Sequence, residues 1–260
     1  MAGGIELDIG KTVHENASAY YERAKELRKK AESAKKAIED TEKEIAKELK
    51  AESEAPPRKA VRVKKEKKWF ERFHWFESGE FMALAGRDAK QNEELVWKHL
   101  GEEDLFFHAD IRGAPATVLK NGKRAPESVL NETAQFAAAY SSAWKAGLSS
   151  VDVYAVEKGQ VSKEAQGEYL GTGSFVISGK RRWFKNTELG LKIGVDEKGN
   201  LACVPESTGF PFSKSISLKP GDKEKGEAAR AIAKELGASI DEVLSILPAG
   251  NFGYALGKRN

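Results

Sequence analysis

The most regular pattern of apolar and polar residues lies near the start of the chain. From Val13 to Ile45, small or apolar side chains recur at alternating spacings of four and three residues, which is the a/d pattern of a coiled coil. Thr12 and Glu15 have the spacing of a capping box, and no glycine or proline follows before Pro56. The pattern predicts one long helix over residues 12–50.

The a/d positions of this helix are mostly alanine, so a partner helix could approach closely but would bury little apolar area. Residues 11–50 hold 11 basic and 9 acidic side chains, a net charge of +2, which is typical of a solvated face. Two interpretations stay open. The helix is either a coiled-coil arm, which self-association would complete, or a lone solvated helix.

After residue 68 the pattern changes to short apolar runs and shorter helical segments. Strand-like runs are separated by turn residues, and the helical segments stand apart from them, which favours an α+β fold with a mixed, largely antiparallel sheet and packed helices. Residues 160–217 read as short strands with turns. The predicted strands are 81–85, 105–109, 116–120 and 151–156, and the predicted helices are 89–99, 128–145, 223–236 and 239–247.

Charge is concentrated between the long helix and this α+β part. Residues 58–68 carry seven basic side chains and one acidic one, a net charge of +6. The run leads directly into an aromatic segment that starts at Trp69, and aromatic rings interleaved with basic groups suit base stacking and phosphate contact. Two alternatives stay open. The basic run can be a solvated linker, and the aromatic side chains after it, such as Trp69, Phe73 and Phe76, can belong to the core.

Composition narrows the possible functions. The 260 residues include one cysteine, Cys203, so neither an intrachain disulfide nor a cysteine-based zinc cluster is possible, and a reducing cytoplasm fits. No apolar run approaches the ~20 residues of a membrane span, and Met1–Asp8 does not read as a signal peptide. Residues 5–9 alternate like a short strand, which indicates the remnant of an upstream domain. We expect no membrane association, no metal and no cofactor.

The segment from His108 to Gly113 is the strongest candidate for chemistry. An imidazole, a carboxylate (Asp110) and a guanidinium (Arg112) follow a predicted strand and precede a glycine turn. His108 and Asp110 share one face if the strand continues. RNA contact, a hydrogen bond that stiffens the turn, and acid–base catalysis on RNA are the three interpretations, in that order of preference.

Three other segments suit phosphate contact. Gly86–Glu93 is a turn into a helix start, with Arg87 beside a cap at Asp88, although Arg87 paired with an acidic residue is an equal alternative. Ser162 and Lys163 precede a glycine-containing stretch that does not match a Walker A sequence. Ser178–Lys185 combines four basic and two aromatic residues in a predicted hairpin, which is suited to RNA or simply exposed and charged.

Several of these motifs, taken in order, resemble the NFACT-R (DUF814) domain of ribosome quality control proteins, in particular the archaeal and eukaryotic NEMF/RqcH group. The resemblance is carried by Lys68–Phe76, Gly86–Glu93, Asp104–Pro115 and, later, Gln160–Arg181, while Glu15–Tyr21 is similar to the start of the family's coiled coil. Residues 192–215 match poorly.

The resemblance implies a non-catalytic RNA-binding module. Family members bind large ribosomal subunits obstructed by a peptidyl-tRNA and recruit tRNA for mRNA-independent extension of the nascent chain. The expected partners are therefore tRNA and large-subunit rRNA, with an RNA-processing enzyme or a coiled-coil docking module as alternatives. NFACT-N and helix-hairpin-helix domains, which full-length members carry, are absent from this sequence.

The expected organisation is a remnant (1–11), a coiled-coil helix (12–57), a basic linker (58–68), the NFACT-R domain (69–250) and a tail (251–260). Trp75 or Tyr169 would stack on a base. The candidate RNA-binding residues are Arg87, Asp88, Asn92, His108, Asp110, Arg112, Ser162, Lys163, Tyr169, Lys180, Arg181 and Arg182.

Overall fold

The structure is a computed structural model that describes residues 7–53, 68–165, 168–169 and 171–255. The side chains of residues 45–53, 164–165, 168–169 and 255 lie outside this description. The chain divides into two units, residues 1–65 and 66–260. Most of the predicted basic linker, residues 58–67, lies outside the described residues.

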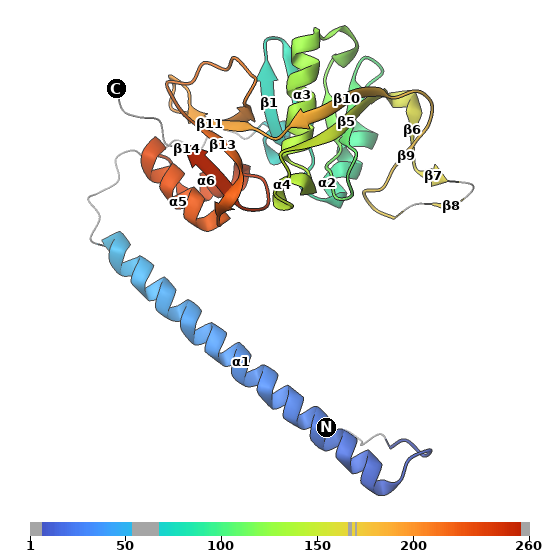
Figure 1. The fold of residues 1–260 in the computed structure, drawn as a ribbon, viewed down its shortest axis with the longest axis vertical. Helices are drawn as coiled ribbons and strands as arrows, with labels where there is room; N and C mark the ends of the chain where they lie inside the picture. The colour runs from blue at the N-terminus through green and yellow to red at the C-terminus, as the bar shows by residue number, and fades with distance from the viewer. Residues whose placement is uncertain (1–6, 54–67, 166–167, 170, 256–260) are drawn as a thin grey trace. The chain divides into compact units, whose positions relative to one another are not determined.

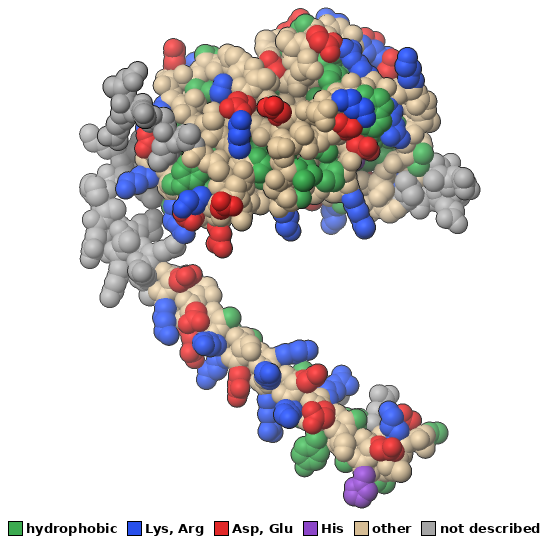
Figure 2. Space-filling model, viewed as in Figure 1, with side chains coloured by type: hydrophobic (Ala, Val, Ile, Leu, Met, Phe, Trp, Pro, Cys, Tyr) green, Lys and Arg blue, Asp and Glu red, His purple; other side chains and the backbone are tan. Residues whose placement is uncertain are grey.

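The first unit is the helix α1 (Val13–Ser53) (Figure 1). The capping box is confirmed, because Glu15 accepts a hydrogen bond from the Thr12 backbone N–H and Thr12 Oγ1 accepts one from the Glu15 N–H. The backbone N–H of Thr12 and then its hydroxyl, which both donate to the Glu15 carboxylate, lower the pKa of Glu15. Acidic and basic side chains are interspersed along the helix (Figure 2), and the coiled-coil partner stays a prediction.

The strand predicted at residues 5–9 is wrong for its described part. Asp8 and Lys11 instead close a turn, with the Lys11 N–H donating to the Asp8 carbonyl. The buried Asn16 side chain binds both backbone groups of Asp8, at 2.9 and 3.0 Å. A polar side chain of the helix therefore takes the hydrogen bonds that a neighbouring strand would have used.

The second unit is built on two antiparallel sheets, which confirms the α+β prediction (Figure 1). The larger sheet has six strands in the order β1 (His74–Ser78), β2 (Phe81–Ala85), β4 (Thr117–Leu119), β3 (Leu105–Ala109), β5 (Ser150–Glu157), β10 (Arg182–Glu188). The smaller has four, in the order β12 (Leu201–Pro205), β11 (Leu191–Val195), β13 (Lys214–Lys223), β14 (Phe252–Ala255). Two short ribbons pair β6 (Val161–Ser162) with β9 (Val176–Ile177) and β7 (Glu164–Ala165) with β8 (Glu168–Tyr169).

The helices of this unit match the predicted ones with two differences. They are α2 (Ala89–Glu94), α3 (Glu127–Ala139), α4 (Ser142–Lys145), α5 (Lys225–Leu236) and α6 (Ile240–Ile246). The predicted helix 89–99 changes to a π-helical turn at Leu95. The predicted helix 128–145 is interrupted after Ala139, because Ser141 leaves the helical conformation and its hydroxyl caps the Ala143 N–H of α4.

Two other segments differ from expectation. Residues 182–188 do not form a hairpin of their own, because β10 pairs with β5 at the edge of the six-stranded sheet. Residues 252–255, expected in a tail, pair with β13 as β14. Both pairings join segments far apart in the chain, which local patterns do not reveal.

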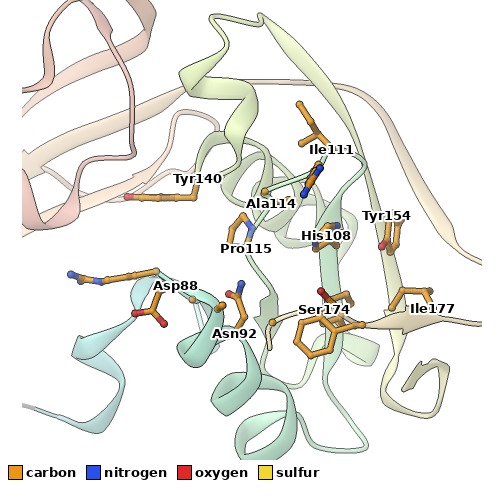
Figure 3. Close-up of a pocket in the computed structure, with 18 residues that line it drawn as sticks. Asp88, Asn92, His108, Ile111, Ala114, Pro115, Tyr140, Tyr154, Ser174 and Ile177 are labelled. Carbon is orange, nitrogen blue, oxygen red and sulfur yellow. The ribbon is translucent and has the colours of Figure 1, made fainter. Parts of the chain in front are cut away.

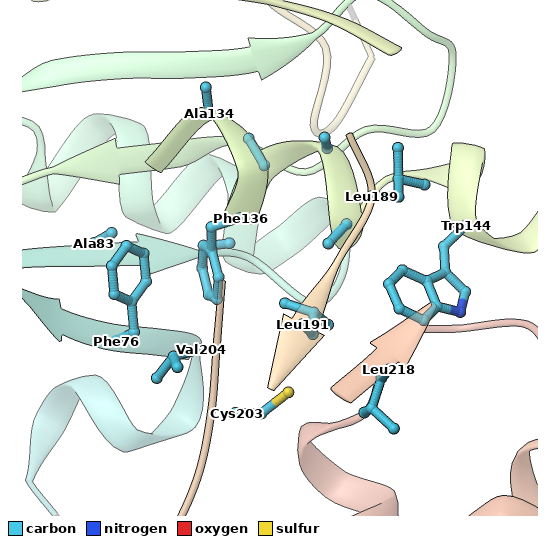
Figure 4. Packing of buried hydrophobic residues seen from close by; sticks show 14 of the residues in the cluster. Phe76, Ala83, Ala134, Phe136, Trp144, Leu189, Leu191, Cys203, Val204 and Leu218 are labelled. Atoms are coloured by element: carbon cyan, nitrogen blue, oxygen red, sulfur yellow. The ribbon is translucent and has the colours of Figure 1, made fainter. Parts of the chain in front are cut away.

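A continuous hydrophobic core joins the two sheets through α3 (Figure 4). Phe76, Phe136, Trp144, Leu191 and Leu218 are all almost fully buried in it. The opposite face of the six-stranded sheet carries a separate buried cluster. The alternation of strand residues decides which cluster each side chain joins.

The aromatic segment divides between core and surface. Phe73 and Phe76 are buried, as expected, whereas Trp69 is 50% exposed and stacks on His99 with ring centroids 4.3 Å apart. Trp75 is half-buried, with its ring edge against Phe70. Trp69 is therefore the member of this segment that departs from the core interpretation.

Candidate nucleic-acid interface

A cleft of about 510 Å³ opens on the face of the six-stranded sheet opposite α3 (Figure 3). Its floor consists of Phe106 and His108 of β3 with Tyr154 of β5. Three segments form its walls: residues 86–92, 111–115 and 173–177. Phe106 and His108 share this face because they are two residues apart on one strand, while Phe107 faces the core on the other side.

His108 lies among aromatic rings at the floor of the cleft. Its ring is nearly parallel to that of Phe106, with centroids 6.1 Å apart, and lies 5.8 Å from Tyr154. Burial lowers the pKa of His108, and the opposing effects of the Ala109 and Ala114 backbone and of Asp110 are smaller. The imidazole is therefore neutral at pH 7, with one nitrogen that donates and one that accepts.

The turn from β2 into α2 places Arg87, Asp88 and Asn92 in the wall of the cleft. Asp88 caps α2, because its carboxylate accepts from the Gln91 N–H at 2.8 Å. The Asn92 side-chain oxygen accepts from the Ala116 N–H at 3.1 Å, and Figure 3 shows the Asn92 amide at the cleft. A Cβ on Gly86 would lie 2.2 Å from that oxygen, so the close approach requires glycine.

Arg87 is not paired with an acidic residue within the described part of the chain, so the alternative weighed from the sequence does not hold there. Its guanidinium donates to the Phe73 carbonyl at 3.1 Å. Because Asp88 fills the start of α2 with its own carboxylate, a phosphate at that helix start would meet a negative charge.

The loop after β3 displays Asp110 and Arg112. The strand ends at Ala109, so Asp110 does not continue on the face of His108 but begins the loop, with its N–H donating to the Asp152 carbonyl. Arg112 is exposed and lines the cleft, and its carbonyl accepts from the Ser142 hydroxyl at 2.6 Å. Asp110 is exposed and lies outside the cleft lining.

The glycine-containing segment after β8 closes one side of the cleft. Gly173 has a φ of +80°, and a Cβ there would lie 2.7 Å from the Ala89 Cβ. This contact brings Phe175 to 5.9 Å from the Phe106 ring. In the sequence, this segment was marked only by its two glycines, and these did not identify Phe175 as a residue of the site.

The two arginines at the start of β10 lie on opposite faces of the sheet. The Arg181 guanidinium lies over the ring of Tyr154, 4.6 Å from its centroid, so it adjoins a residue of the cleft without lining the cleft itself. Arg182 lies over Phe184, at 5.7 Å, and pairs with Glu127 of α3. The sequence grouped these residues, and strand alternation separates them.

Ser162, Lys163 and Lys180 also lie outside the described cleft lining. Lys163 pairs with Glu93, and Ser162 and Lys180 are exposed. The Lys180 carbonyl accepts from the Gln160 side chain at 2.9 Å. Tyr169 belongs to β8, but its side chain lies outside the described residues.

Tyr140 and Tyr154 also line the cleft, and the sequence did not single them out. Tyr140 follows α3, stacks on His74 at 4.1 Å and donates its hydroxyl to the Ile246 carbonyl at 2.6 Å. Tyr154 is opposite His108 in the antiparallel register. Pairing of strands 105–109 and 151–156 was the signal that could have identified Tyr154.

Three further findings concern metal binding, thiol chemistry and membrane-spanning helices. Among the described residues, no group of three or more His, Cys, Asp or Glu side chains is arranged to hold a metal ion. Burial raises the pKa of the Cys203 thiol to about 12, so it is protonated at neutral pH. A search of the helices in the described part of the chain found none long and apolar enough to cross a membrane.

Comparisons with known proteins point to RNA. Residues 71–179 match the family model described as NFACT protein RNA binding domain. The chain is 41% identical over 198 residues to the archaeal Rqc2 homolog aRqcH of Methanocaldococcus jannaschii, which covers 73% of this chain and 30% of that protein. It is 36% identical over 197 residues to the human ribosome quality control complex subunit NEMF, covering 73% of this chain and 18% of that protein.

A solved structure, the C-terminal part of the fibronectin/fibrinogen-binding protein from Streptococcus suis, aligns with a TM-score of 0.39 and 20% identity. The alignment covers 68% of this chain and 77% of that one. The chain spans less than a third of the length of the archaeal and human relatives.

Proposed function

We propose that this chain holds RNA in the cleft. Its residues 71–179 carry the NFACT protein RNA binding domain of the Rqc2, RqcH and NEMF ribosome quality control proteins. The RNA is tRNA or large-subunit rRNA, and binding supports the extension of stalled nascent chains without mRNA in the cytoplasm. The ribosome performs the peptide transfer, so the module itself is not a catalyst.

One observation carries this proposal, the combination of aromatic floor and cationic rim in a single cleft. An unpaired base would stack on Phe175 at the side of the cleft, and the neutral His108 would hydrogen-bond to a base edge. Arg87, Arg112 and Arg181 stand around this floor for the phosphates of the same strand. A cleft of about 510 Å³ falls within the range of small-ligand sites.

The other residues proposed from the sequence have secondary places in this arrangement. Asn92 is at the cleft wall, where its amide can reach a base, and Asp88 shapes the wall as a helix cap. Lys180 precedes Arg181 and would extend the phosphate path. Asp110, Ser162, Lys163 and Arg182 lie outside the described cleft lining, and the proposal gives them no base contact. The Tyr169 side chain lies outside the described residues.

The test measures binding of a fluorescent tRNA to the whole chain across a salt series, with large-subunit rRNA as a second ligand. Arg181→Ala is compared with its matched control Arg182→Ala, which removes the same charge from the other face. We expect Arg181→Ala to weaken binding and to lower the log–log salt slope by roughly 0.7 to 0.9, the value for one phosphate contact. Arg182→Ala should bind as the wild type does.

Absence of RNA binding at low salt, or equal losses in both variants, would contradict the proposal. The enzymatic alternative is checked on the same samples. RNA that stays intact during long incubation favours binding alone, whereas cleavage that His108→Ala abolishes would favour catalysis by His108 and Asp110.

A further inference from the structure

Two basic side chains, one in the cleft lining and one outside it, lie close to the stacked rings of His74 and Tyr140. Arg87 comes from the turn after β2 and Lys225 from the start of α5. The Arg87 guanidinium donates to the Phe73 carbonyl at 3.1 Å, and the Lys225 ammonium donates to the Leu247 carbonyl at 2.9 Å. Within the described residues, neither side chain has a carboxylate at ion-pair distance.

The stacked rings of His74 and Tyr140 connect the two segments whose carbonyls the cations bind, because His74 follows Phe73 and Tyr140 is hydrogen-bonded next to Leu247. The two rings are stacked at 4.1 Å, and the Tyr140 hydroxyl donates to Ile246, the residue before the one that Lys225 binds. Burial lowers the pKa of His74 to about 3, and the positive fields of Arg87 and Lys225 add to the shift. His74 is therefore neutral at pH 7 and offers no negative charge to either cation.

Each cation is also affected by its surroundings. Burial lowers the pKa of Lys225, and the positive charge of Arg87 lowers it further. Tyr140 is the one group that opposes the effect of burial on the pKa of Arg87. Its own pKa is raised by burial, so the phenol is neutral at pH 7 and supplies no counter-charge.

Two neighbouring cations with no counter-charge repel one another, and folded proteins normally pair such groups. An oxyanion between them would remove the repulsion and gain charge-assisted hydrogen bonds. A guanidinium that has used one of its five donors on a carbonyl keeps others for phosphate oxygens. Arg87 and Tyr140 also line the cleft, so this position is continuous with the proposed RNA path.

We propose that Arg87 and Lys225 together bind one phosphate of the RNA strand whose base occupies the cleft. The inference rests on the proposed function and adds a contact from outside the segment that matches the RNA binding domain family, because Lys225 lies beyond residue 179. The C-terminal part, with α5 and the four-stranded sheet, is then part of the RNA interface and not only a support for the core.

The rival explanation is purely structural. Lys225 satisfies the carbonyl of the buried Leu247, and Arg87 satisfies that of Phe73, so each could be retained as a donor alone. The two explanations differ in one respect. A structural donor affects stability, whereas a phosphate ligand also affects RNA affinity and its dependence on salt.

The experiment compares three variants of the whole chain in the tRNA salt series. Lys225→Met removes the charge and keeps an unbranched side chain, and Lys225→Arg keeps the charge and the donor. Lys223→Met is the matched control, because Lys223 is two residues away and pairs with Glu227 at 3.0 Å. Thermal unfolding of each variant identifies any loss that comes from instability.

We expect Lys225→Met to weaken tRNA binding by about tenfold, the effect of one charged hydrogen bond, and to reduce the salt slope by roughly 0.7. Lys225→Arg should keep the wild-type slope even where it alters stability, and Lys223→Met should leave both quantities unchanged. NMR titration with inorganic phosphate should shift the Arg87 Nε–Hε signal in the wild type, and not in Lys225→Met.

If Lys225→Met keeps the salt slope and the tRNA affinity of the wild type, this inference alone is overturned and the cleft stays the RNA site. Equal losses in Lys225→Met and Lys223→Met would overturn it as well, since a general charge effect would then explain both. Absence of tRNA binding by the wild type would overturn the proposed function together with this inference.

Discussion

The two faces of the six-stranded sheet use the same strands for different purposes. On the face toward α3, Phe107, Ala109 and Phe184 pack into the continuous core, and small helix residues such as Ala137 allow close contact. On the opposite face, Phe106 belongs to a smaller cluster that ends at an open cleft. A single residue step along a strand moves a side chain from one role to the other.

This difference shows how the fold can support a binding site without losing its stability. The closed face buries most of the large side chains, so the other face can keep a half-buried histidine and exposed arginines. Two histidines illustrate the contrast. Burial lowers the pKa of both, but His74 is stacked on Tyr140 and does not line the cleft, whereas His108 does.

The largest expected effect is a difference in the free energy of unfolding between variants of two neighbouring residues of β3. Phe107→Ala should lower the free energy of unfolding by roughly 3 to 5 kcal/mol, because it leaves a cavity in the closed face. His108→Ala should lower it by only about 1 kcal/mol, yet weaken RNA binding, because the imidazole faces open space. Urea unfolding and tRNA binding on both variants check this contrast, and similar unfolding free energies would break it.

The second prediction concerns His74 and pH. Its pKa is about 3 in the folded chain and near 6.5 when unfolded, so below pH 6.5 the unfolded chain takes up a proton that the folded chain does not. The free energy of unfolding should therefore decrease as the pH is lowered, by about 2 kcal/mol from pH 6.5 to pH 5. His74→Phe keeps a ring against Tyr140 and should lose this part of the dependence.

Urea unfolding at pH 7 and pH 5 compares the wild type with His74→Phe. An identical decrease in both proteins would mean that other groups cause the pH dependence. A smaller decrease in the variant assigns the difference to His74.

The smallest effect concerns Asp88 at the wall of the cleft. Asp88→Ala should destabilise the fold by about 1 kcal/mol through loss of the α2 cap, and Asp88→Ser should restore most of this, because serine also caps. RNA affinity should not fall in either variant, since Asp88 is negatively charged. Lower RNA affinity in a stable Asp88→Ser variant would instead make Asp88 a direct RNA contact.

Much of the fold followed from local patterns in the sequence. The capping box at Thr12 and Glu15, the cap at Asp88, and the strands predicted at 81–85 and 105–109 have local causes, namely side-chain spacing and hydrogen bonds over three or four residues. The family motifs also identified the RNA-binding class, which the match over residues 71–179 confirms. Arg87, Asp88, Asn92, His108 and Arg112 were chosen from the sequence and do meet at one cleft.

The rest of the site depends on contacts between distant segments. Arg181 lies over Tyr154 and Arg182 pairs with Glu127 on the other face, because the pairing of β10 with β5 sets the face that each side chain occupies. Phe175 reaches the cleft through the contact of Gly173 with Ala89, and Lys225 reaches the Leu247 carbonyl only after α5 has packed. The sequence by itself determined the local elements and the kind of chemistry, since these depend on neighbouring residues. Tertiary structure decided which charged and aromatic groups converge, because strand register and packing fix those distances and no local pattern encodes them.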